Sequence, residues 1–127
     1  MKTTSYEISK KLAEIGFKAD AIFAWRKTDG ELLGYPHHIN GEEMVLKHYY
    51  LAYDLETILD ALPESILDKK TASFKEFLTL RTDGIFYECD LTVDHIGVER
   101  EGNESLADTA ARLLLKLVEK GILTFKK

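Results

Sequence analysis

Three histidines, His37, His38 and His48, are the side chains whose type and proximity first suggest chemistry in this sequence. Imidazole nitrogens bind Zn²⁺ and related ions, so a small metal-dependent hydrolase is one hypothesis. However, no two histidines lie one helical turn apart, and no Cys/His pairing is present. Adjacent histidines in an extended segment also point in opposite directions. We therefore favour exposed loop histidines, expect no metal site, and keep the hydrolase as the alternative.

Potential nucleophiles are present, but none lies in a recognisable catalytic pattern. Cys89 is the single cysteine, and it falls on the apolar side of an alternating strand pattern, which predicts a buried, unreactive thiol. Ser105 is explained by helix capping. The glycines are scattered singly, so no phosphate-binding loop is predicted. We expect no catalytic residues, no cofactor and a protein that is not an enzyme.

Aromatic side chains are concentrated near the middle of the chain, beside a histidine. The residues expected to bind a ligand or partner are Trp25, Tyr35, His48, Tyr49, Tyr50 and Tyr53. If these side chains converge, they form a surface suited to a planar ligand or to a protein partner. The competing interpretation is that Trp25, Tyr49 and Tyr53 fill the core between the first hairpin and the second helix.

Composition limits the class of protein. The chain has 127 residues, a formal net charge of −5 and a sequence pI near 5.4, which disfavours bulk attraction to nucleic acid or to an anionic membrane. Neither a signal-peptide core nor an apolar run of about 18 residues is present. A single cysteine suits a reducing compartment. The sequence predicts one cytoplasmic domain over residues 1–127, with no membrane association and no nucleic acid as partner.

The elements that must position these side chains begin with two short helices. Thr4 and Glu7 form a capping-box pattern, which predicts a helix over residues 5–15. Asp54 caps a second helix, LETILDAL, which Pro63 ends.

The third predicted helix is the longest and lies within residues 103–123. Ser105 caps it, Asp108 closes a short capping box, and Gly121 follows its end. Two adjacent apolar stripes give it a wide buried face: Leu106, Ala110, Leu113, Leu117 and Ala107, Ala111, Leu114, Val118. A face this wide needs cover on two sides, from the same chain or from a second copy. The side chains proposed for contact with a second copy are Leu114, Leu115 and Val118.

The remaining elements are predicted strands that form hairpins around two turns, Thr28-Asp29-Gly30 and Thr82-Asp83-Gly84. Hairpins between separated helices predict an α+β fold, with three helices and one antiparallel sheet layered as an α/β/α sandwich. The expected strands are 21–27, 31–35, 71–81, 85–92 and 96–99, with a loop over 35–43. Residues 44–50 are expected to form a further strand or, as the alternative, the lead-in to the second helix.

Three segments, TSYEISKKLAEIGF, AYDLETILDALP and ESLADTAARLLLKLVEKGIL, resemble a phage α/β/α (ABA) sandwich domain family. Its members are small proteins carried by phages and prophages of gut bacteria. The resemblance extends over nearly the whole chain through the order and spacing of these segments. It implies a sandwich fold and a phage or prophage origin, and it assigns no catalytic residues to this sequence.

These observations lead to three functional hypotheses. The leading hypothesis is a non-enzymatic accessory protein that binds a protein partner or a small ligand, with counter-defence as one version drawn from the phage resemblance. The metal-dependent hydrolase that uses His37, His38 and His48 is the second. A structural virion or assembly component is the third. Homo-oligomerisation through the third helix is compatible with the first and the third.

Overall fold

The computed structural model describes residues 3–39, 47–67, 75–81, 83–88 and 96–125; of residues 35–39, 65–67, 75–77 and 88 it describes the backbone. Within these ranges the helices are α1 (Tyr6–Glu14), α3 (Leu55–Ala61) and α4 (Leu106–Glu119). The strands are β1 (Ala21–Arg26), β2 (Leu32–Ile39), β3 (Tyr49–Ala52), β4 (Ser65–Leu67), β5 (Lys75–Arg81), β6 (Gly84–Glu88) and β7 (Ile96–Glu99).

The described strands form two antiparallel sheets. The first has the order β2-β1-β3, so β1 is central, and Trp25 pairs with Leu32 on one side and Tyr50 on the other. The second sheet has the order β4-β5-β6-β7. Every pairing is antiparallel, and together with the three helices this confirms the predicted α+β class.

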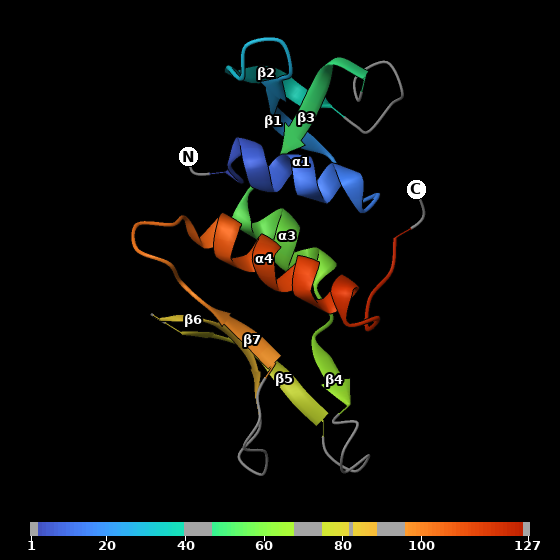
Figure 1. Ribbon diagram of the computed structural model, residues 1–127, viewed down its shortest axis with the longest axis vertical. Helices are drawn as coiled ribbons and strands as arrows, with labels where there is room; N and C mark the ends of the chain where they lie inside the picture. The colour runs from blue at the N-terminus through green and yellow to red at the C-terminus, as the bar shows by residue number, and fades with distance from the viewer. Residues whose placement is uncertain (1–2, 40–46, 68–74, 82, 89–95, 126–127) are drawn as a thin grey trace.

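The layers run in a different order from the predicted sandwich. Figure 1 shows the helices between the two sheets, with α1 next to the sheet of β1–β3 and α4 next to the sheet of β4–β7. The contacts agree, because α1 touches β3 and α4, whereas α4 touches α3, β6 and β7. The prediction of one sheet with helices on its faces is therefore wrong, because the helices lie between two sheets. Local patterns define the hairpins, but they do not say which hairpins share a sheet.

Helix α1 has well-defined ends. Its N-cap is Ser5, whose side chain accepts the N–H of Ile8, so the cap lies one residue after the predicted Thr4. At the other end, Gly16 has a φ of 86°, and its N–H donates to the Ala13 carbonyl. The N–H of Phe17 donates to the carbonyl of Leu12, which completes a Schellman motif. This motif fixes the direction in which the chain leaves the helix.

The predicted caps of the other two helices are confirmed. Asp54 accepts the N–H of Thr57 at the start of α3, and Ser105 accepts the N–H of Asp108 at the start of α4. Gly121, with a φ of 76°, follows the end of α4. The predicted capping box of α4 is only half formed, because the Asp108 carboxylate accepts the N–H of Ser5 in α1's N-terminal segment.

The wide apolar face of α4 is covered by its own chain. Its fully buried apolar side chains include Ala110, Ala111, Leu113, Leu114 and Leu117. Leu114 was predicted to contact a second copy, but it has no exposed surface in the single chain. Leu115 is partly buried against the core and Val118 is half-buried, so the single chain covers much of the predicted interface.

The strand boundaries show two further corrections and one omission. The strand predicted over residues 44–50 overlaps only the start of β3 (Tyr49–Ala52), and Lys47 and His48 before it are helical. β2 continues to Ile39, so Pro36, His37 and His38 belong to a strand, whereas the sequence predicted a loop from residue 35. β4 was not predicted. The predicted hairpin of β5 and β6 is confirmed where the structure describes it, and so is the short strand β7. Cys89 and residues 44–46 lie outside the described residues.

Candidate functional site

The N-terminal segment is attached to β3 and β1 by a buried group of hydrogen bonds around Thr4. The Thr4 hydroxyl lies 2.7 Å from Ser9 Oγ and accepts the backbone N–H of Tyr53 at 3.1 Å. The Thr4 N–H donates to the Tyr53 carbonyl, and the Thr4 carbonyl accepts the indole N–H of Trp25 at 2.9 Å. Thr4 and Ser9 are almost fully buried, so these bonds replace contacts with water. This arrangement holds α1 beside the first sheet.

Three aromatic rings meet where α1 begins beside β1 and β3. The ring of Tyr6 packs edge-on against Trp25, with 6.1 Å between centroids, and against Tyr50, with 5.5 Å. Trp25 and Tyr50 are cross-strand partners, which accounts for their proximity. The Lys27 ammonium lies 4.6 Å from the centroid of the Tyr50 ring, within the range of a cation–π interaction.

A hollow of about 260 Å³ opens beside Tyr50, and we call it the basic hollow. Its lining residues are Ala13, Glu14, Phe17, Lys18, Lys27 and Tyr50. Two of them carry a positive charge and one carries a negative charge, so the lining is net positive although the whole chain carries −5. Apolar groups from α1, Phe17 and Tyr50 combined with a few charged groups are typical of small-molecule sites.

The residues that line the basic hollow are held by strong local structure. Phe17 is 4% exposed and packs edge-on against Tyr53 and Phe125, with centroid distances of 4.9 and 5.3 Å. Lys18 follows Phe17 directly. The backbone N–H of Lys27 donates to the His48 carbonyl at 3.0 Å. The backbone of Lys27 is thus fixed relative to the segment that leads into β3 and Tyr50, which reduces the entropy cost of binding.

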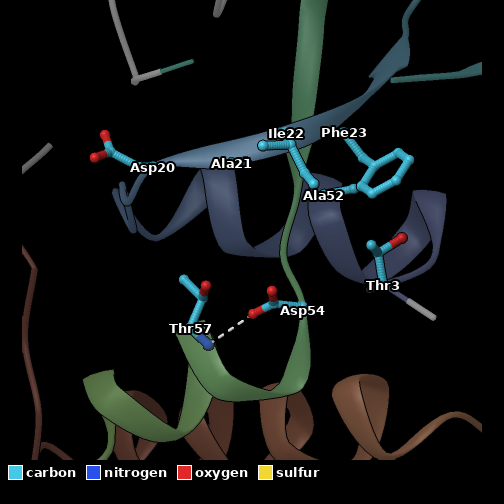
Figure 2. Close-up of a pocket in the computed structure, with 8 residues that line it drawn as sticks. All are labelled: Thr3, Asp20, Ala21, Ile22, Phe23, Ala52, Asp54 and Thr57. Carbon is cyan, nitrogen blue, oxygen red and sulfur yellow. Dashed lines mark hydrogen bonds between the residues drawn. The ribbon is translucent and has the colours of Figure 1, made fainter. Parts of the chain in front are cut away.

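Two further hollows are present, one beside the segment that follows α1 and one between β1, β3 and the start of α3. One, of about 470 Å³, shares Phe17 and Lys18 with the basic hollow and also contains Asp20, Asp60 and Phe125. The other, of about 40 Å³, is too small for an organic ligand. Figure 2 shows that its Asp54 carboxylate accepts the Thr57 N–H, while the Asp20 carboxylate is directed away from Asp54. These carboxylates do not converge on one point.

The structure divides the predicted aromatic surface into exposed and core residues. Trp25 and Tyr50 come together, and both are half-buried. Tyr53 is 3% exposed and belongs to the core, and Tyr49 packs against the core, as the competing interpretation predicted. The indole N–H of Trp25 is bound by Thr4, so its polar group serves the fold. His48 is exposed and directly precedes β3.

The structure describes Tyr35 and two histidines of the alternative hydrolase hypothesis only in part. The side chains of Tyr35, His37 and His38 lie outside the described part of the structure, so the hydrolase hypothesis stays a prediction. Among the side chains that the structure does describe, no group of three or more His, Cys, Asp or Glu residues is positioned to hold a metal ion. No helix in the described ranges is long and apolar enough to span a membrane.

The sequence interpretation missed several residues of the candidate site, namely Tyr6, Ala13, Phe17, Lys18 and Lys27. Tyr6 and Ala13 lie two helical turns apart on one side of α1, and Phe17 directly follows the terminating Gly16, which is a signal that could have been used. The meeting of this side with Tyr50 could not be predicted locally, because it depends on how α1 packs on β3.

Burial changes the pKa of Tyr53, which packs against Phe17 of the basic hollow. It raises the pKa of the Tyr53 hydroxyl to about 12, although a hydrogen bond with the backbone of Ala19 acts in the opposite direction. Tyr53 is therefore neutral at physiological pH, and it supplies packing rather than charge beneath Phe17.

Comparison of the chain with protein-family models, with curated proteins and with solved structures finds no match. The resemblance to the phage α/β/α sandwich family therefore stays a prediction from the sequence.

Proposed function

We propose that this protein is a non-enzymatic binding module whose ligand or partner docks at the basic hollow. The observation that carries this proposal is the position of Tyr50, which borders a hollow of about 260 Å³ and contacts both Tyr6 and the Lys27 ammonium. The proposal includes a phage or prophage origin, which is supported by the sequence resemblance alone.

Two properties of the hollow support binding. Aromatic and apolar side chains supply contact area at a low entropy cost, because their rings have few rotatable bonds and are already packed. The lysines add directional polar contacts at the same opening. The volume of the basic hollow is near the lower end of the range for ordinary ligand sites. A hollow of this size favours a single ring or a single side chain of a protein partner.

The proposal is tested by screening neutral aromatic fragments with backbone amide NMR spectra of the intact chain. We expect perturbed amides to cluster at Ala13, Lys18, Lys27 and Tyr50, because these residues border one hollow. Tyr50→Ala should abolish the clustered perturbation. Fragments that perturb residues scattered over the molecule, or that bind Tyr50→Ala unchanged, would show that the hollow is not the binding site.

A matched control separates loss of the site from loss of the fold. Glu119→Ala changes an exposed residue at the end of α4, outside the lining of the basic hollow, and should leave fragment binding unchanged. The amide spectrum of Tyr50→Ala must remain dispersed for its result to count. Tyr50→Phe keeps the ring and removes the hydroxyl, so it should retain most of the binding if ring contact is the main contribution.

A further inference from the structure

The charge of the basic hollow identifies the class of ligand, an inference that rests on the proposed function. We propose that the hollow binds a small aromatic anion, with its ring beside Tyr50 and Ala13 and its acidic group between the ammonium groups of Lys18 and Lys27. The occupant is a free small molecule that carries one planar ring and one acidic group.

The argument from charge starts with the contrast between the hollow and the chain. The whole chain has 22 acidic and 17 basic residues, so a surface hollow chosen at random would be more often acidic than basic. The basic hollow instead has two lysines and one glutamate. An anion at this opening gains attraction from both ammonium groups, and Glu14 opposes it from the exposed end of α1.

The argument from shape concerns the apolar part of the lining. Ala13 and Tyr50 are half-buried, and Phe17 is almost completely buried behind them, so the floor of the hollow is formed by rigid apolar groups. A flexible aliphatic acid would lose more conformational entropy there than a planar ring. The volume of about 260 Å³ is suited to a single ring system.

A set of three probes with the same ring isolates the contribution of charge. Indole-3-acetate is an anion, indole-3-acetamide is its neutral counterpart, and tryptamine is a cation. Titrations of the intact chain followed by amide NMR should show the anion binding about fivefold more tightly than the amide, which is the size expected for two charge contacts at the protein surface. Tryptamine should bind most weakly. The advantage of the anion should shrink at about 1 M salt, because the Debye length falls to about 3 Å.

Matched substitutions on the rim give effects of opposite sign. Lys18→Gln should weaken binding of the anion about twofold to threefold, and Glu14→Gln should strengthen it by a similar factor, while neither changes the affinity for the amide. Both positions are exposed, so these variants should fold normally. The double charge reversal Lys18→Glu with Lys27→Glu should make tryptamine the preferred probe.

The outcomes distinguish this inference from the function on which it rests. Equal affinity for the three probes, at a site that Tyr50→Ala removes, would overturn the aromatic-anion assignment and leave the binding function standing. Binding of neither these probes nor neutral fragments at the hollow would overturn both. A preference for the anion that is unaffected by Lys18→Gln and by Glu14→Gln would also overturn the assignment, because the charge contact would then lie elsewhere.

Discussion

The Asp108 carboxylate accepts a hydrogen bond from the backbone N–H of Ser5, with 2.7 Å between Oδ1 and nitrogen. Each residue also takes part in an N-terminal cap, since Ser5 caps α1 and the N–H of Asp108 is bound by the α4 cap, Ser105. Burial raises the pKa of Asp108, and the hydrogen bonds from Ser5 act against this increase. One side chain therefore joins the N-terminal ends of two helices from opposite ends of the sequence.

Asp108→Ala should reduce the free energy of unfolding by about 1–2 kcal/mol, because it leaves the Ser5 N–H without its acceptor. Asp108→Asn keeps the Oδ1 acceptor and removes a half-buried charge, so its stability should lie close to that of the wild type. Urea unfolding followed by circular dichroism measures both. Equal losses for the alanine and asparagine variants would show that the hydrogen bond contributes little.

Thr4→Val is predicted to destabilise the protein by about 1–3 kcal/mol. Valine has nearly the shape of threonine, but it leaves the buried Tyr53 N–H without its Thr4 Oγ1 acceptor. The Ser9 hydroxyl also loses Thr4 Oγ1 and keeps the carbonyl of residue 4, 3.3 Å away. Thr4→Ser retains the hydroxyl and should cost much less. The unfolding midpoints of the two variants provide the comparison, and a serine variant as unstable as the valine variant would instead assign the effect to the lost methyl group.

Gly97→Ala should cost about 1–3 kcal/mol through overpacking in the second sheet. A Cβ at this position would lie 2.8 Å from Cγ of Phe86, its cross-strand partner, and 2.9 Å from the Ile85 carbonyl oxygen. Phe86→Ala should recover part of this cost, because it removes the ring but leaves the carbonyl. A double-mutant cycle measures the coupling, and a coupling free energy near zero would contradict the predicted ring contact.

Gly102→Ala serves as the control for Gly97→Ala. No atom lies within 4 Å of a Cβ placed there, but its φ is +50°, so the cost should be limited to about 1 kcal/mol of backbone strain. The loss for Gly102→Ala should not change when Phe86 is replaced.

Stability should fall between pH 10 and pH 12. Burial raises the pKa of Tyr53 and of Tyr87 from 10 to about 12. The folded state holds these two protons more tightly than the unfolded state does. The resulting stabilisation is complete below pH 10 and is lost as pH approaches 12. The free energy of unfolding falls by at most about 1.4 kcal/mol per pH unit for each tyrosine.

Tyr87→Phe is the control for the predicted loss of stability between pH 10 and pH 12. This variant removes one titrating group, together with the hydrogen bond from the Tyr87 hydroxyl to the Pro63 carbonyl, so it should start from a lower stability and decline less steeply above pH 10. Urea midpoints at successive pH values give the two slopes. Identical slopes for the wild type and the variant would contradict the assignment to Tyr87.

The sequence predicted the elements whose signals are local. Ser105, Asp54 and Gly121 mark helix ends through contacts within a few residues, and each has the predicted position. Gly30, with a φ of 70°, similarly accounts for the turn between β1 and β2. Such features are encoded by neighbouring residues, so they can be identified without knowledge of the packing.

The layer order and the candidate site depend on contacts between distant residues. Asp108 has two available partners, Ser105 nearby and Ser5 far away, and only the packing of α1 against α4 selects the second. In the same way, the spacing of tyrosines does not reveal that Tyr53 faces the core while Tyr50 borders a hollow. Tyr6 was missed because its role is determined by the helix that carries it and the strands beneath that helix.

The contact between Ser5 and Asp108 spans 103 positions of the chain and joins the start of α1 to α4. Both helices belong to the layer between the two sheets (Figure 1). During synthesis on the ribosome, each hairpin can form soon after it emerges, but α1 has no α4 to pack against until residues 106–119 have been translated. The nascent chain should therefore expose the side of α1 that packs on α4 until α4 emerges, even after β3 has covered its other side. Recognition of that segment by chaperones would protect the chain from aggregation before α4 arrives.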